Sequence, residues 1–184
     1  MTYVDPDPEC DEEGWGTARS TAVAVTAAVA FGGSYVATYG LDQYSTYTEA
    51  LGPNGVVLQF GVIAGLVVLH EIVHAVVYAT VGGLSWEDIA VEVGLDFDDP
   101  LDPVHHSVHP TRPLRRRAYY AGVAAPGVVL GLLPATLALA TGNALAMFVG
   151  VVGLLLLSTD VPALVGAWRH PEAIAASDPA QQEV

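Results

Sequence analysis

The feature that most constrains this chain is an apolar segment, residues 55–81, long enough to cross a lipid bilayer as a helix. Its only acidic, basic or imidazole side chains are His70, Glu71 and His74. A charged side chain near the centre of a bilayer costs about 2.5–3.5 kcal/mol on insertion scales. Three such groups kept together inside one apolar segment therefore indicate a function.

The three residues form the pattern His-Glu-x-x-His. On a helix, His70 and His74 lie four positions apart on one face, so both imidazoles can reach one metal ion. Glu71 lies on an adjacent part of the helix surface, where its carboxylate can take a proton from a metal-bound water. The pattern predicts a Zn²⁺ site with His70 and His74 as metal ligands and Glu71 as the catalytic residue.

Three further apolar windows have the length of a membrane span: residues 18–39, 118–140 and 144–168. Hydrophobic residues make up 52% of the chain, which is more than soluble domains contain. We therefore expect an all-α membrane protein with four transmembrane helices in one domain, residues 18–171. An acidic, disordered N-terminal tail (residues 1–17) and a polar C-terminal tail (residues 172–184) complete the expected organisation.

The charge of the chain excludes some partners. Its formal net charge is -14, with 20 Asp and Glu against six Arg and no Lys. An acidic chain without Lys resembles salt-adapted, halophilic proteins. Nucleic acid is not an expected partner, because a phosphate backbone needs a basic face. Cys10 is the only cysteine, so the chain forms no internal disulfide and no cysteine-based metal site.

All six arginines lie at the start of the first window, between the second and third, or after the fourth. The positive-inside rule then places both termini and the loop over residues 82–117 in the cytoplasm of a multi-pass cell-membrane protein. Within this loop, apolar and other residues alternate over residues 89–97, which predicts a β-strand. A shorter and weaker strand is expected over residues 104–108. The loop should therefore form a small cytoplasmic β-hairpin.

A catalytic zinc usually has three protein ligands, so a third must come from another span. Asp160 is the only acid in the fourth window. His70 and His74 lie 15 and 19 residues after Gly55, and Asp160 lies 17 residues after Asn143. At about 1.5 Å per residue, two parallel helices bring these side chains to a similar depth. Asp160 is the predicted third metal ligand, and the alternatives are loop histidines 105, 106 and 109.

These features resemble the zincin peptidase family of small multi-pass membrane proteins, formerly a domain of unknown function. The matching residues are the His-Glu-x-x-His pattern, Gly82-Gly83, Ala125-Pro126 and the Ser-Thr-Asp at 158–160. The layout is also similar to site-2 proteases, which pair a His-Glu-x-x-His helix with a distant Asp. The last motif differs, because Asp160 is followed by Val161-Pro162 where those proteases carry Gly. The resemblance implies a zinc peptidase.

We therefore expect a zinc-dependent membrane-embedded endopeptidase that acts on peptide bonds of membrane or membrane-adjacent substrates. Its partners would be the lipid bilayer and a peptide or membrane-protein substrate. The alternatives are a non-catalytic membrane metal-binding or scaffold protein and a small metal transporter. A transporter needs polar residues that continue toward the outer face, and the second span beyond His70 offers only Gln59.

Overall fold

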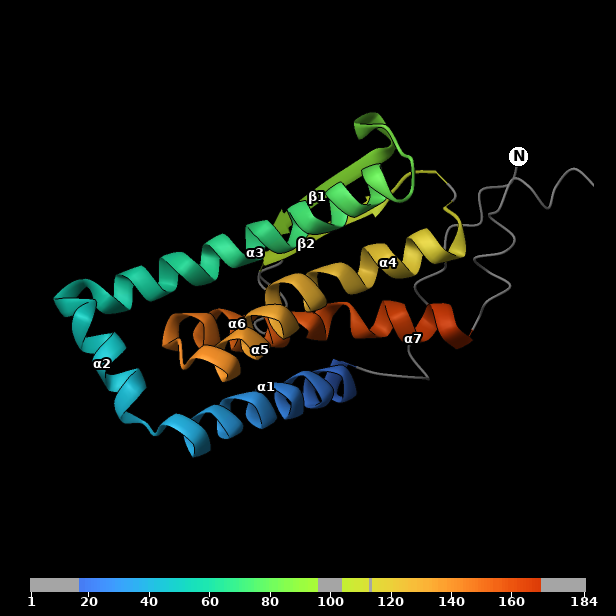
Figure 1. The fold of residues 1–184 in the computed structure, drawn as a ribbon. Coiled ribbons are helices and arrows are strands. Elements are labelled where there is room, and N and C mark those ends of the chain that lie inside the picture. The colour runs from blue at the N-terminus through green and yellow to red at the C-terminus, as the bar shows by residue number, and fades with distance from the viewer. Residues whose placement is uncertain (1–16, 96–103, 113, 170–184) are drawn as a thin grey trace, which may run out of the picture.

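The computed structural model describes residues 17–95, 104–112 and 114–169. The described chain is mainly helical and carries one two-stranded sheet (Figure 1). The elements are α1 Thr17–Tyr39, α2 Asp42–Ala50, the 3₁₀ helix η2 Gly52–Asn54, α3 Gly55–Thr80, the 3₁₀ helix η3 Trp86–Asp88, β1 Ile89–Leu95, β2 Val104–Pro110, α4 Arg116–Pro126, the π-helix η4 Gly127–Leu132, α5 Leu133–Thr141, α6 Ala144–Leu156, the 3₁₀ helix η5 Leu157–Thr159 and α7 Val161–Arg169.

Three of the described helical stretches are long and apolar enough to cross a membrane: Arg19–Tyr39, Gly52–Thr80 and Arg116–Thr141. A fourth stretch passes the same test only as a pair, Ala144–Thr159 with Val161–Arg169, which is bent by 45°. The four windows predicted from the sequence coincide with these stretches. The break lies at Asp160, two residues before Pro162, whose ring nitrogen has no hydrogen to donate to the preceding helix.

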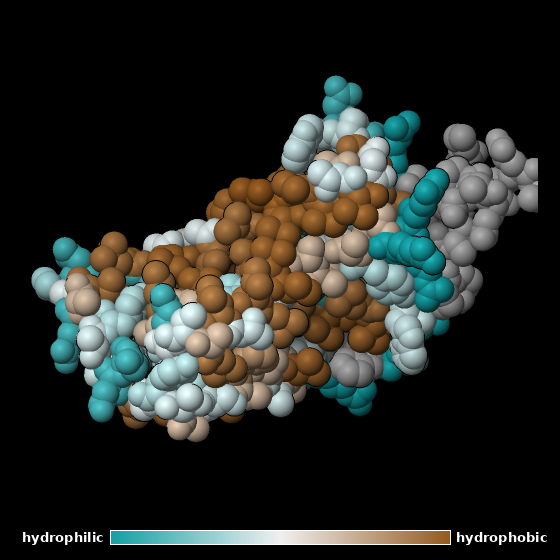
Figure 2. Space-filling view, viewed as in Figure 1, coloured by the Kyte–Doolittle hydropathy of each residue, from teal (hydrophilic) through white to brown (hydrophobic). Residues whose placement is uncertain are grey.

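Large apolar side chains cover much of the outer surface of the helices. Figure 2 shows them as a brown area over the middle of the molecule, with hydrophilic residues gathered at the ends. On α3, Val57 and Phe60 are 72% and 67% exposed. Contiguous apolar surface of this kind marks an interaction with lipid or protein. The arrangement is therefore consistent with a membrane protein.

Glycines let the last two spans approach at backbone distance. A Cβ added to Gly150 would lie 2.6 Å from the backbone nitrogen of Ala135, and one added to Gly153 would lie 2.2 Å from the carbonyl oxygen of Leu130. Any larger residue would force the helices apart, so hydrogen is the only side chain that this packing accepts. Gly131 of the third span packs in the same way against Leu154 of α6. This contact holds the helix that leads to Asp160.

The predicted hairpin forms, with a longer second strand than expected. β1 and β2 are antiparallel and pair in register from Ile89↔Pro110 to Leu95↔Val104. The expectation that the second strand is short, ending at Val108, is wrong: pairing to β1 extends it to Pro110. Ile89 and Val108 pack against a buried cluster formed by Tyr78, Leu114 and Ala118. This packing places the hairpin alongside α3 (Figure 1), and its expected turn at residues 98–103 lies outside the described residues.

The base of the hairpin is held by polar contacts around Asp88. Its carboxylate accepts hydrogen bonds from the Ser85 hydroxyl at 2.7 Å and from the Arg112 guanidinium at 3.3 Å. The Ser85 hydrogen bond, together with Arg112, holds the pKa of Asp88 below its usual range. The carboxylate therefore stays charged near neutral pH and fixes the start of β1 to the end of β2.

The segment between the first two spans, residues 41–54, is more ordered than the sequence suggests. It was expected to be a loop, and it forms α2 followed by η2. The helix contributes no buried residue and therefore needs no apolar stripe. Hydrophobic periodicity consequently gives no signal for it. Only Tyr47 packs inward, against the cluster that contains Tyr35. The expected tails lie outside the described residues, except Thr17, which begins α1.

Candidate metal centre

His70 and His74 face the interior because of where α3 is covered by other elements. Of the 26 residues of this helix, the five that are buried include both histidines: Leu66, His70, His74, Ala75 and Tyr78. They recur at helical spacing and form one narrow face toward α4 and α6. The two imidazoles are 2% and 6% exposed. The spacing of the sequence pattern therefore places both rings inside the bundle.

Asp160 lies at the break in the fourth span. The carbonyl of Leu157 accepts the Asp160 backbone N–H at 3.1 Å, and the Asp160 carbonyl accepts from Leu164 at 3.0 Å. Pro162 is the second residue of α7, where a helix needs no N–H donor. The side chain of Asp160 is 9% exposed. The bend thus turns a carboxylate into the interior from a segment that is otherwise apolar.

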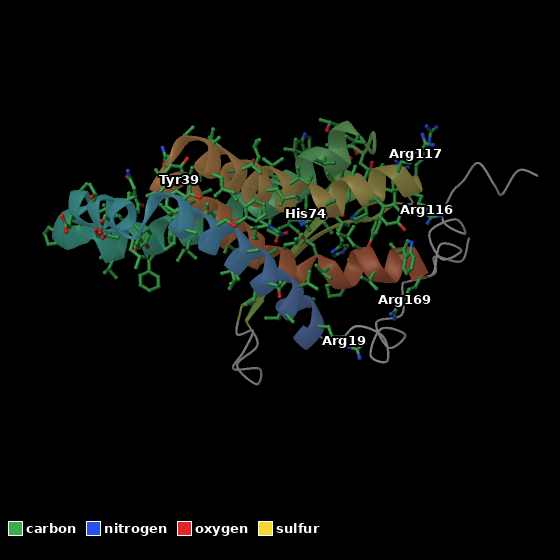
Figure 3. The ribbon with its side chains drawn as sticks, turned by 60° about the horizontal axis from the view of Figure 1, so that its bottom comes forward. Arg19, Tyr39, His74, Arg116, Arg117 and Arg169 are labelled. Carbon is green, nitrogen blue, oxygen red and sulfur yellow. The ribbon has the colours of Figure 1, made fainter. Side chains whose placement is uncertain are left out.

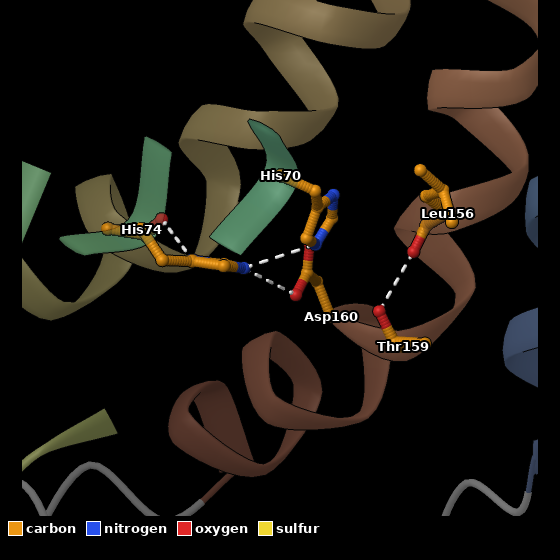
Figure 4. Close-up of polar contacts among 6 residues, drawn as sticks. His70, His74, Leu156, Thr159 and Asp160 are labelled. Atoms are coloured by element: carbon orange, nitrogen blue, oxygen red, sulfur yellow. Dashed lines mark hydrogen bonds and ion pairs between the residues drawn. The ribbon is translucent and has the colours of Figure 1, made fainter. Parts of the chain in front are cut away.

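The three predicted ligands meet at one point (Figure 4). The Nε2 atoms of His70 and His74 are 3.2 Å apart. His74 Nε2 lies 3.1 Å from Asp160 Oδ1, and His70 Nε2 lies 3.3 Å from Asp160 Oδ2. Among the described residues, these three make up the group of His, Cys, Asp and Glu side chains that could hold a metal ion, with ligand atoms within 4.8 Å of one another. The depth match inferred from the sequence is reproduced in space.

The donor set fits zinc. Ligands at 2.0–2.2 Å in a tetrahedral arrangement lie about 3.3 Å from one another, close to the distance between the two Nε2 atoms and to the distance from each of them to its nearer Asp160 oxygen. Oδ2 of Asp160 is buried and, although Nε2 of His70 lies 3.3 Å away, it accepts no hydrogen bond in the described part of the chain. A buried carboxylate oxygen without a hydrogen bond is costly unless a cation neutralises it. The Asp160 carboxylate and the two imidazoles beside it are a suitable set of ligands for a divalent zinc ion.

A backbone carbonyl orients one of the two imidazoles. The Nδ1 atom of His74 lies 2.9 Å from the carbonyl oxygen of Gly122 on α4, and this contact is buried. The ring also stacks on Tyr78 at 6.1 Å between centroids and 17° between planes. Sequence reasoning did not identify either partner. An orienting acceptor beside a histidine ligand is the usual arrangement around protein-bound zinc.

The remaining candidates lie outside this group. Glu71 follows His70 on α3 and is half-buried, so it stands beside the three ligands without being one of them. His109 pairs with Ala90 in the hairpin and does not belong to the group. The backbones of His105 and His106 pair with Gly94 and Val93, and their side chains lie outside the described residues. Among the described side chains, Asp160 is the one that completes a group with His70 and His74.

Comparison with known families agrees with this site. The family model described as "putative zincin peptidase" matches residues 63–174, more than half of the chain. The chain belongs to this family. The matched region contains His70, Glu71, His74 and Asp160, together with the hairpin and the last two spans. No curated protein and no solved structure matches the chain.

Membership of a zincin family implies zinc and a peptide-hydrolysing activity. The range that the family model matches contains the residues of α3 and of the bend before α7 that meet in the structure. The centre is therefore a candidate zinc site of a zincin peptidase.

Proposed function

We propose that this zincin-family protein is a zinc-dependent, membrane-embedded endopeptidase that hydrolyses peptide bonds of membrane or membrane-adjacent substrates. The observation that carries the proposal is the meeting of His70, His74 and Asp160 at one buried point, with Glu71 on the same turn of α3. His70, His74 and Asp160 would hold the metal. When bound there, zinc supplies Lewis-acid activation of water and of the substrate carbonyl.

Glu71 is the proposed general base and acid. Its carboxylate would accept a proton from the attacking water and pass a proton to the leaving amine, which avoids two charged intermediates. The position of Glu71 outside the group of ligands supports this role, because a carboxylate that binds the metal is less free to carry protons. His74 would keep its Nε2 lone pair toward the metal while its Nδ1–H is held by Gly122.

The hairpin offers a means of holding an extended substrate. β2 lies against α3, whereas β1 is the outer strand and its Val91 is 64% exposed. An outer strand presents backbone N–H and C=O groups to which another chain can pair. A substrate segment could therefore bind by strand addition along β1, in the extended form that a peptidase requires.

We further propose that both termini lie in the cytoplasm of a multi-pass cell-membrane protein. Figure 3 shows Arg19, Arg116, Arg117 and Arg169 at one end of the molecule and Tyr39 at the other, with His74 between them. Reporter fusions after Val184 and within residues 41–54 should then report opposite sides of the membrane, through the positive-inside bias. If both fusions report the same side, the number of spans is wrong.

Metal removal tests the enzyme directly. The purified protein in liposomes, incubated with single-span membrane peptides, is expected to produce fragments that mass spectrometry detects. A chelator that strips zinc should abolish the fragments, and added zinc, but not magnesium, should restore them, because magnesium disfavours a site with two imidazoles. Cleavage that persists in protein shown to be free of zinc would overturn the proposal.

A further inference from the structure

The carbonyl that orients His74 is normally occupied in a helix. In α4, the carbonyl oxygen of Gly122 would accept the backbone N–H of the residue four positions later. That residue is Pro126, which lies inside the helix and has no N–H. The next donor along the chain, the N–H of Gly127, is hydrogen-bonded to the carbonyl of Ala124. The Gly122 oxygen is therefore available to a side chain of another helix.

Gly122 also lets that other helix come close. A Cβ added at this position would lie 2.1 Å from Cε1 of Tyr78 and 2.6 Å from its Cδ1. Tyr78 is one turn beyond His74 on α3, and both are buried. Only glycine leaves space for the Tyr78 ring. Only glycine therefore lets α4 approach α3 closely enough for the Gly122 carbonyl to reach the His74 imidazole. The missing Cβ of Gly122 and the missing N–H of Pro126 both favour the contact between the Gly122 carbonyl and His74.

We propose that Gly122 and Pro126 are positioning residues for the metal centre, and this inference rests on the proposed function. Pro126 frees the Gly122 carbonyl from its helical hydrogen bond, and Gly122 brings that carbonyl to Nδ1 of His74. A carbonyl oxygen only accepts hydrogen bonds, so Nδ1 carries the proton of the neutral ring. Nε2 then keeps its lone pair and faces His70 and Asp160.

The proposal explains a proline that is otherwise costly. Pro126 is among the most completely buried side chains, and proline within a helix removes a hydrogen bond and strains the backbone. The chain continues after it as the π-helix η4 before returning to α5. Such π-helical segments are frequent at functional sites. The distortion of the third span thus serves to orient one imidazole, that of His74, on the second span.

The test is Pro126→Ala, with Pro134→Ala as its matched control. Pro126→Ala restores an N–H that competes for the Gly122 oxygen and so releases Nδ1 of His74. Pro134→Ala adds an N–H to the same span, but next to no histidine. Two readouts are used on the full-length protein in detergent: zinc affinity by competition with a chelator, and ¹⁵N NMR of the histidine side chains in the metal-free protein.

Zinc affinity is expected to fall by about 10- to 100-fold in Pro126→Ala, the usual effect of removing an orienting partner, and to stay unchanged in Pro134→Ala. In the metal-free wild type, His74 should be the tautomer protonated at Nδ1, and Pro126→Ala should shift it toward the Nε2-protonated form. Circular dichroism checks that each variant keeps its helices.

Two results would overturn the inference. One is unchanged zinc affinity and tautomer in Pro126→Ala. The other is an Nε2-protonated His74 in the wild type, which is measured whether or not the variant folds. Failure of the proposed function looks different, since a wild type that binds no zinc, or cleaves without it, leaves the tautomer measurement interpretable.

Discussion

His70→Ala and His74→Ala should each abolish stoichiometric zinc binding, whereas the wild type should hold about one zinc per chain. Each substitution removes one of three ligands whose atoms lie 3.1–3.3 Å apart. Two remaining ligands do not retain zinc through purification, and a methyl group in place of an imidazole leaves the buried Asp160 without its partner. Elemental analysis of the purified variants measures the outcome.

Further variants grade the loss of zinc binding and provide a control. Asp160→Ala should weaken zinc binding because it removes a ligand oxygen. The zinc affinity of Asp160→Asn should lie between those of the wild type and Asp160→Ala, since an amide oxygen is a poorer ligand than a carboxylate. His109→Ala is the matched control, because His109 lies on β2 outside the group of ligands. Full zinc content in both His70→Ala and His74→Ala would mean that the metal is held elsewhere.

Glu71→Gln should keep zinc bound and lower peptide cleavage by about 10²–10⁴-fold, the usual contribution of a general base. Glutamine preserves the size and a polar tip of the side chain while it removes the proton acceptor. The experiment compares zinc content and cleavage of membrane peptides in liposomes. Glu87→Gln is the matched control, because it makes the same chemical change at an exposed residue of η3.

This variant separates the enzyme from its rivals. If Glu71→Gln retains both zinc and full cleavage, the proposed mechanism is wrong. If the wild type binds zinc but cleaves no peptide, a metal-binding scaffold becomes the better interpretation. A metal transporter would instead require polar groups along the outer half of α3, where Gln59 contacts Tyr44 and its neighbours Leu58 and Phe60 are exposed apolar side chains.

The metal ligands could be predicted because their signals are local and additive. The spacing of His70 and His74 places them on one helix face, and the apolar surroundings make any polar residue conspicuous. Asp160 followed from counting residues from the start of its span, because a membrane-length helix has a nearly fixed rise per residue. The distances show that the three side chains meet, while their binding of a metal stays a prediction.

Other parts of the site could not be predicted in this way. His74 and Gly122 are 48 residues apart in the sequence, and the contact between them depends on how closely their two helices pack. No pattern on α3 alone indicates which carbonyl it meets, although the proline four residues after Gly122 marks a carbonyl without its helical donor. Likewise α2 is short and has no buried residue, so the long apolar windows that revealed the spans have no counterpart there.

The bend that carries Asp160 has a mechanical consequence. His74 and Asp160 are 86 residues apart, so a metal ion held by both would cross-link the chain as a disulfide does. In water, closing a loop of this size restricts the unfolded chain by about 4–5 kcal/mol. The effect is smaller in a bilayer, where separated spans remain helical. A metal bound by both residues would therefore favour the docking of the broken last span against α3, and the centre would stabilise the helix bundle as well as serve as a reactive site.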